Sequence, residues 1–127
     1  MKYTMKINKE DYAMQVINIF SCMYPFSTLQ KKEKLILAIF MNEYMKMKDT
    51  STKVEIFNHL FSYDFKKYIS YIIPKVKGEN VSILYVTNYI TNIRKKGFFK
   101  GDTIPDKYLK LFSNIESEIS FKIELKN

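Results

Sequence analysis

The chain has 127 residues, of which 46% are hydrophobic and 16% aromatic, and its formal net charge is +8. This length fits a single domain, residues 1–127, with enough apolar side chains for a core, which excludes a disordered chain. One cysteine, Cys22, excludes an internal disulfide, and no apolar run reaches the ~18–20 residues of a membrane-spanning helix.

The two ends of the chain predict β-strands. In residues 1–8, Tyr3, Met5 and Ile7 alternate with polar side chains, and residues 116–127 alternate more strongly. A period of two indicates a half-buried strand. We expect the two ends to pair as neighbouring strands of one small sheet.

Helices follow from residue 9 to residue 73. Residues 9–24 repeat apolar side chains at spacings of three and four, which predicts a helix that buries Ala13, Val16, Ile17, Phe20 and Met23. Pro25 ends this helix, and Ser27 or Thr28 is expected to cap a longer one that runs to about Lys48. Its buried side is predicted to hold Leu35, Ile36, Ala38, Ile39, Phe40 and Tyr44.

Two shorter helices are expected next. Residues 49–51 predict a break and a new cap, followed by a helix over 54–61. Asp64 is expected to cap the next helix, whose apolar side is predicted to hold Phe65, Tyr68, Ile69, Ile72 and Ile73. Residues 74–80 contain proline, glycine and asparagine and predict a loop.

Residues 82–104 contain the most informative pattern. Ser82 is expected to cap a helix that runs to Lys96, and Gly97 to end it in a left-handed conformation. Residues 98–99 and 103–104 predict the two strands of a hairpin around a turn at 100–102. Pro105 is expected to open a last helix through Phe112.

The helix over 82–96 separates into an apolar and a polar side. Its buried stripe is predicted to consist of Ile83, Val86, Ile90 and Ile93, with a further contribution from Tyr89. The opposite side is predicted to present Tyr85, Asn88, Asn92, Lys95 and Lys96. Amides of this kind can bind adenine in a major groove, and ammonium groups can hold phosphates.

The run over 86–99, Val-Thr-Asn-Tyr-Ile-Thr-Asn-Ile-Arg-Lys-Lys-Gly-Phe-Phe, resembles the recognition helix and wing entry of winged helix-turn-helix proteins, such as those of tailed bacteriophages. The resemblance covers about residues 28–105. It implies a mainly α fold with small β content (α+β): a winged-helix-like core with short terminal strands and a β-hairpin wing.

The resemblance also implies a DNA interface. The helix over 82–96 would enter a groove, with Tyr85, Asn88 and Asn92 facing bases. The phosphates would be contacted by Arg94, Lys95, Lys96 and Lys100. We therefore expect a small, non-enzymatic, nucleic-acid-binding protein, with double-stranded DNA as its partner, acting as a phage-like regulator or packaging factor.

A second hypothesis is a structural protein of a phage virion, a connector or ring component that acts through assembly with other virion proteins or as a homo-oligomer. The location would be the cytoplasm of a bacterial host, or the virion. Arg94 is the only arginine among 21 basic residues, and the lysine-rich composition is equally typical of an AT-rich genome, so the charge alone decides nothing.

No pattern indicates catalysis, a metal or a cofactor. His59 is the only histidine, no cysteine cluster accompanies it, and three scattered glycines cannot form a phosphate-binding loop. We expect His59 at a helix edge, no small-molecule substrate and no membrane partner. Six tyrosines near lysines could stack on unpaired bases, serve a protein interface or lie in the core: Tyr63, Tyr68, Tyr71, Tyr85, Tyr89 and Tyr108. The core is expected for Tyr68 and Tyr89.

Overall fold

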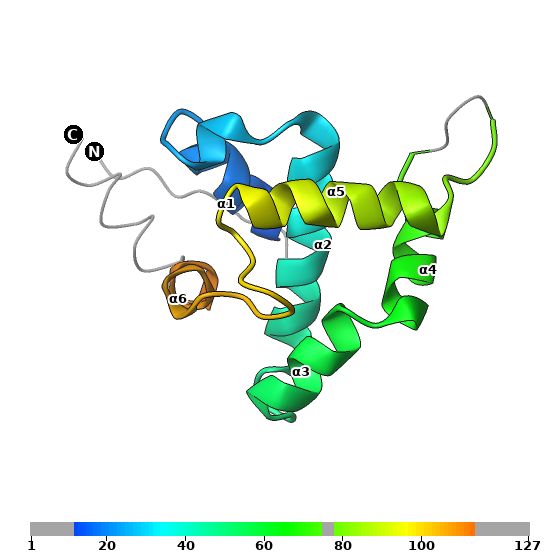
Figure 1. The fold of residues 1–127 in the computed structure, drawn as a ribbon. Helices are drawn as coiled ribbons and strands as arrows, with labels where there is room; N and C mark the ends of the chain where they lie inside the picture. Colours follow the sequence, from blue (N-terminus) through cyan, green and yellow to red (C-terminus); the bar gives the residue numbers. More distant parts are fainter. Residues whose placement is uncertain (1–11, 75–77, 114–127) are drawn as a thin grey trace.

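A long central helix organises the fold (Figure 1). The computed structural model describes residues 12–74 and 78–113. These form α1 (Tyr12–Phe20), the 3-10 helix η2 (Phe26–Thr28), α2 (Lys31–Met47), α3 (Lys53–Leu60), α4 (Tyr63–Ile72), α5 (Ile83–Lys95) and α6 (Asp106–Ser113). The central helix, α2, packs against α1, α3, α5 and α6, while α4 packs against α3 and α5. In Figure 1, α5 crosses α2 and forms an outer layer.

Aromatic rings hold these helices to α2. Phe40, on α2, is fully buried and contacts Phe61, Phe65 and Phe99 at centroid distances of 5.2, 5.5 and 5.0 Å. Edge-on and tilted ring contacts of this kind add stability beyond the apolar area that they bury. Phe40 therefore contacts the C-terminal end of α3, the first turn of α4 and the segment after α5 at one point in the core.

Side-chain oxygens cap the N-termini of three of the helices. Thr52, Ser62 and Ser82 each accept a hydrogen bond from the backbone N–H three residues on, at 3.2, 3.1 and 3.1 Å. The predicted cap Ser82 is confirmed. The predicted cap Asp64 is wrong: it lies in the first turn of α4, where a carboxylate still stabilises the helix dipole.

The helix ends near Pro25 also differ from the prediction. α1 ends at Phe20, so Met23 lies beyond the helix and is exposed. η2 occupies the place of the expected cap at Ser27 or Thr28, and the cap of α2 is Gln30. The backbone N–H of Gln30 donates to Glu33 Oε1 at 2.8 Å, which satisfies a group at this helix end.

The buried sides agree with the periodicity at most positions. Of the residues expected in the core of α4, Phe65, Ile69 and Ile73 are buried, whereas Tyr68 and Ile72 are exposed. The stripe on α4 is narrower than predicted because the helix packs on one side only, against α3 and α5. On α2, Leu35 and Ile39 are only half buried.

The predicted β-hairpin wing is absent. After Gly97 the chain makes a tight turn in which Lys100 and Thr103 exchange two backbone hydrogen bonds, of 2.9 and 3.1 Å, as an isolated bridge. Phe98 and Phe99 are both buried, which a half-buried strand with alternating sides cannot achieve. Two residues beyond Thr103, Pro105 has no N–H and cannot extend a ladder.

The fold class is thereby corrected. The described residues form an all-helical domain with no strand, so the winged-helix-like α+β arrangement over 28–105 is wrong. Burial of two successive phenylalanines replaces strand pairing at the position of the wing. Phe98 packs on Phe26 and Tyr108, with centroids 5.0 and 4.9 Å away, and Phe99 packs on Phe40. The terminal strands predicted over 1–8 and 116–127 lie outside the described residues.

Candidate nucleic-acid interface

The predicted apolar stripe of α5 fixes which side of this helix meets water. Val86, Ile90 and Ile93 are buried, as expected, and Ile83 is half buried. At the C-terminal end, Gly97 adopts a φ of 93°, and its N–H donates to the Arg94 carbonyl at 3.0 Å. Both ends of α5 therefore lie where the sequence predicts them.

Three of the predicted site residues share the outer side of α5. Asn88, Asn92 and Lys95 are all exposed, and their spacings of four and three residues place them on successive turns. The sequence of α5 contains no aspartate or glutamate. The ammonium of Lys95 and the two amides have no side-chain partner among the described residues. We call Asn88, Asn92 and Lys95 the outer stripe of α5.

Tyr85, three residues before Asn88, borders the outer stripe but is only partly exposed. Its ring is half buried against that of Tyr89, with centroids 4.8 Å apart, and the two tyrosine hydroxyls are hydrogen-bonded to each other at 3.3 Å. This hydrogen bond, with partial burial as a second cause, raises the pKa of Tyr89. The tyrosine pair therefore covers the flank of α5.

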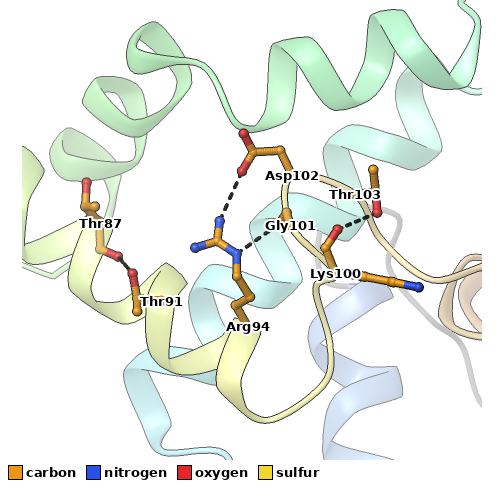
Figure 2. Close-up of polar contacts among 7 residues, drawn as sticks. All are labelled: Thr87, Thr91, Arg94, Lys100, Gly101, Asp102 and Thr103. Atoms are coloured by element: carbon orange, nitrogen blue, oxygen red, sulfur yellow. Dashed lines mark hydrogen bonds and ion pairs between the residues drawn. The ribbon is translucent and has the colours of Figure 1, made fainter.

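Arg94 connects α5 to the turn after it (Figure 2). Its Nε donates to the Gly101 carbonyl at 2.9 Å, and a terminal nitrogen pairs with Asp102 Oδ1 at 3.1 Å. Asp102 neutralises this guanidinium, so Arg94 positions the turn. Lys100, in the same turn, is exposed, and its ammonium has no partner among the described residues.

Two threonines lie on the same side of α5 as Arg94. Figure 2 shows the hydroxyls of Thr87 and Thr91 aligned along the helix. They donate to the carbonyls of Ile83 and Thr87, at 2.9 and 3.0 Å. Such bonds to the preceding turn satisfy the hydroxyls within α5 itself.

Lys96 holds α5 to the start of α2. Its ammonium donates to the Thr28 carbonyl at 2.7 Å and contacts the Glu33 carboxylate, whose side chain is 1% exposed. Both Asp102 and Glu33 are partners that the sequence interpretation missed. Asp102, eight residues from Arg94, is a nearby acid that could have been suspected, whereas nothing local connects Glu33 with Lys96 across 63 residues.

The remaining candidate tyrosines differ in how far they are buried. Tyr108 lies in the core, and desolvation raises the pKa of its hydroxyl. In contrast, Tyr63, Tyr68 and Tyr71 are 63, 53 and 56% exposed on α4. The expectation that Tyr68 belongs to the core is therefore wrong.

His59 has a structural partner. Its Nε2 lies 2.8 Å from Glu43 Oε2, which links α3 to α2, and its ring lies beside Phe65 with centroids 4.9 Å apart. Within residues 12–74 and 78–113, no three acidic, histidine or cysteine side chains gather as they would around a metal ion.

Comparisons with known protein families, with curated proteins and with solved structures give no match to this chain. None of the described helices combines the length and the apolar content needed to cross a bilayer. Of the predicted site residues, those open to a partner are the outer stripe of α5 and Lys100 in the neighbouring turn.

Proposed function

We propose that this protein is a non-enzymatic binding protein for nucleic acid and that it contacts double-stranded DNA through the outer stripe of α5. One observation carries the proposal: two amides and a free ammonium occupy successive exposed turns of a helix without any carboxylate. Asparagine can make paired hydrogen bonds to adenine, and lysine attracts phosphates. The net charge of +8 attracts such a partner over a longer range.

The dimensions of α5 suit a DNA groove. A helix of 13 residues is about 20 Å long. The major groove is about 12 Å wide and accepts one helix. α5 forms an outer layer over α2, so its outer stripe can approach a duplex without the core opening (Figure 1).

The cations near the end of α5 have two different roles in this proposal. Lys95 and Lys100 contact phosphates, because neither ammonium has a partner among the described residues. Arg94 and Lys96 are positioning residues, since their charges are already paired with Asp102 and Glu33. This division replaces the four equivalent phosphate contacts expected from the sequence.

Salt dependence tests this division. Each phosphate contact to a duplex contributes about −0.9 to the slope of log affinity against log salt. We expect the double variant Lys95→Ala/Lys100→Ala to make this slope shallower by about 1.8. The measurement is fluorescence anisotropy of a labelled duplex, titrated with the full chain at several salt concentrations.

A control of equal charge separates a local interface from net charge. Lys46→Ala/Lys110→Ala removes two exposed lysines from α2 and α6 and is expected to leave the slope nearly unchanged. Equal effects of the two double variants would contradict the placement on α5. A wild-type chain that leaves a duplex unbound at low salt would overturn the proposal itself.

A further inference from the structure

The outward side of α4 is unusually aromatic for a surface. Tyr63, Tyr68 and Tyr71 are each more than half exposed on a helix of ten residues, and exposed Lys67 lies between them in sequence. Single apolar side chains on a surface are ordinary, but three rings on one helix are not scattered. We call Tyr63, Lys67, Tyr68 and Tyr71 the tyrosine face of α4.

Helix geometry brings these four side chains to one side. At 3.6 residues per turn, they fall within an arc of roughly 140° and along about 12 Å of axis. The opposite side of α4 holds the buried Phe65 and Ile69. The tyrosine face is thus directed away from the core, on a helix that packs against α3 and α5.

The rings are available to a partner and partly preorganised. None of the three tyrosine hydroxyls has a hydrogen bond with another described residue. Tyr68 is stacked on Phe65, with ring centroids 5.9 Å apart and planes 28° from parallel. Phe65 in turn contacts Phe40, so one side of Tyr68 rests on the core and the other side is exposed.

The chemistry of this face favours unpaired bases. Tyrosine rings stack on any base, and lysine between them attracts the connecting phosphates. A protein interface would also use tyrosine, but lysine is depleted there. The ammonium of Lys67 has no partner among the described residues. The one acid in the same arc, Asp64, lies in the first turn, where it stabilises the helix dipole.

We infer that the tyrosine face of α4 binds single-stranded nucleic acid by stacking on its unpaired bases. This site is separate from the outer stripe of α5, which lies on another helix and has amides and lysine instead of rings. The tyrosine face thus gives the protein a second kind of ligand, an unpaired strand of a few nucleotides, which binds independently of a duplex.

Base stacking can be separated from charge by a probe without bases. The full chain is titrated with oligo(dT) of about 12 nucleotides and with an abasic deoxyribose-phosphate chain of equal length. The ratio of the two affinities cancels the contribution of the phosphates. We expect the wild type to prefer oligo(dT) by at least about tenfold and its tyrosine fluorescence, free of tryptophan, to be quenched. Oligo(rU) in parallel shows whether RNA or DNA supplies the bases, and a preference over the abasic chain for either supports the inference.

A matched pair of variants tests the rings. Changing Tyr63, Tyr68 and Tyr71 together to Phe keeps the rings and should keep the preference for bases. Changing all three to Leu keeps apolar, helix-forming side chains and should abolish the preference, leaving duplex binding unchanged. Single Tyr71→Leu, at an exposed position, should lower oligo(dT) affinity roughly tenfold and guards against misfolding of the triple variant.

Three results would overturn the inference. The first is equal affinity of the wild type for oligo(dT), oligo(rU) and the abasic chain. The second is a Leu variant that keeps the preference of the Phe variant. The third is a protein interface: the Leu changes alter the sedimentation of the chain while oligo(dT) affinity stays the same. Failure of duplex binding, in contrast, would contradict only the proposal for α5.

Discussion

Four cations lie close together at the end of α5, and two of them are paired with acids while the other two are not. Arg94 is paired with Asp102, and Lys96 with the buried Glu33, while the ammonium groups of Lys95 and Lys100 meet water. Adjacent residues 95 and 96 therefore differ in whether their charge is paired. A charge with a buried partner contributes to the fold, and an unpaired exposed charge is open to an external anion.

Lys96 and Lys95 provide a direct test of this difference. Lys96→Ala leaves the Glu33 carboxylate, 1% exposed, without its ammonium partner. We expect the free energy of unfolding to fall by about 2 kcal/mol, less than for a fully buried pair because Lys96 is itself 25% exposed. The control Lys95→Ala should change it by less than about 0.5 kcal/mol. Urea unfolding measures both, and equal losses would contradict the assignment.

The sequence predicts which residues of α5 are polar, but not which of them have partners. Asn88, Asn92 and Lys95 could be placed on one exposed side because helical periodicity alone determines it. The role of Lys96 depends on the packing of α2 against α5, which periodicity does not contain. The contact of Tyr85 with Tyr89, in contrast, lies within α5 itself. The contact between Lys96 and Glu33 joins residues 63 positions apart.

At the scale of elements, local signals predict α5 and fail at the wing. Ser82 and Gly97 bound the helix through backbone chemistry that acts over three or four residues. The segment over 98–104 has the composition of a hairpin, but its conformation is decided by two aromatic clusters that bury Phe98 and Phe99. Tertiary burial of the rings outweighs the local preference for a strand.

The end of α5 should be sensitive to the backbone conformation of Gly97. Its φ of 93° is strained for any L residue with a side chain, and an added Cβ would meet open space. Gly97→Ala is therefore expected to cost about 1 kcal/mol from the backbone alone. Gly97→Asn should cost less, because asparagine tolerates left-handed conformations better. Thermal unfolding compares the two, and an Ala variant as stable as the wild type would contradict this account.

At the scale of the whole molecule, two sets of groups contribute to the dependence of stability on pH. A hydrogen bond with Lys53 lowers the pKa of Asp106, and hydrogen bonds with Thr52 lower that of Glu55. A lowered carboxyl pKa stabilises the fold above its unfolded value, near pH 4, and this contribution is lost as the pH falls. The pKa values of Tyr89 and Tyr108 are raised, so these groups stabilise the fold below their unfolded value. Their contribution is lost as the pH rises beyond about 10.

We therefore expect melting temperature to form a plateau between about pH 5 and pH 9.5 and to fall on both sides. On the acid side, the growing positive charge of an already cationic chain adds self-repulsion. Lys53 Nζ lies 2.9 Å from Asp106 Oδ1, and this ion pair joins α3 to α6. Asp106→Asn should therefore make the fall of the melting temperature on the acid side shallower. The control Asp49→Asn changes an exposed acid without an ion pair among the described residues. If both variants show the same acid limb as the wild type, the link between α3 and α6 does not contribute to the loss of stability in acid. If only Asp106→Asn has a shallower limb, that part of the acid sensitivity comes from one contact between residues 53 positions apart in the sequence.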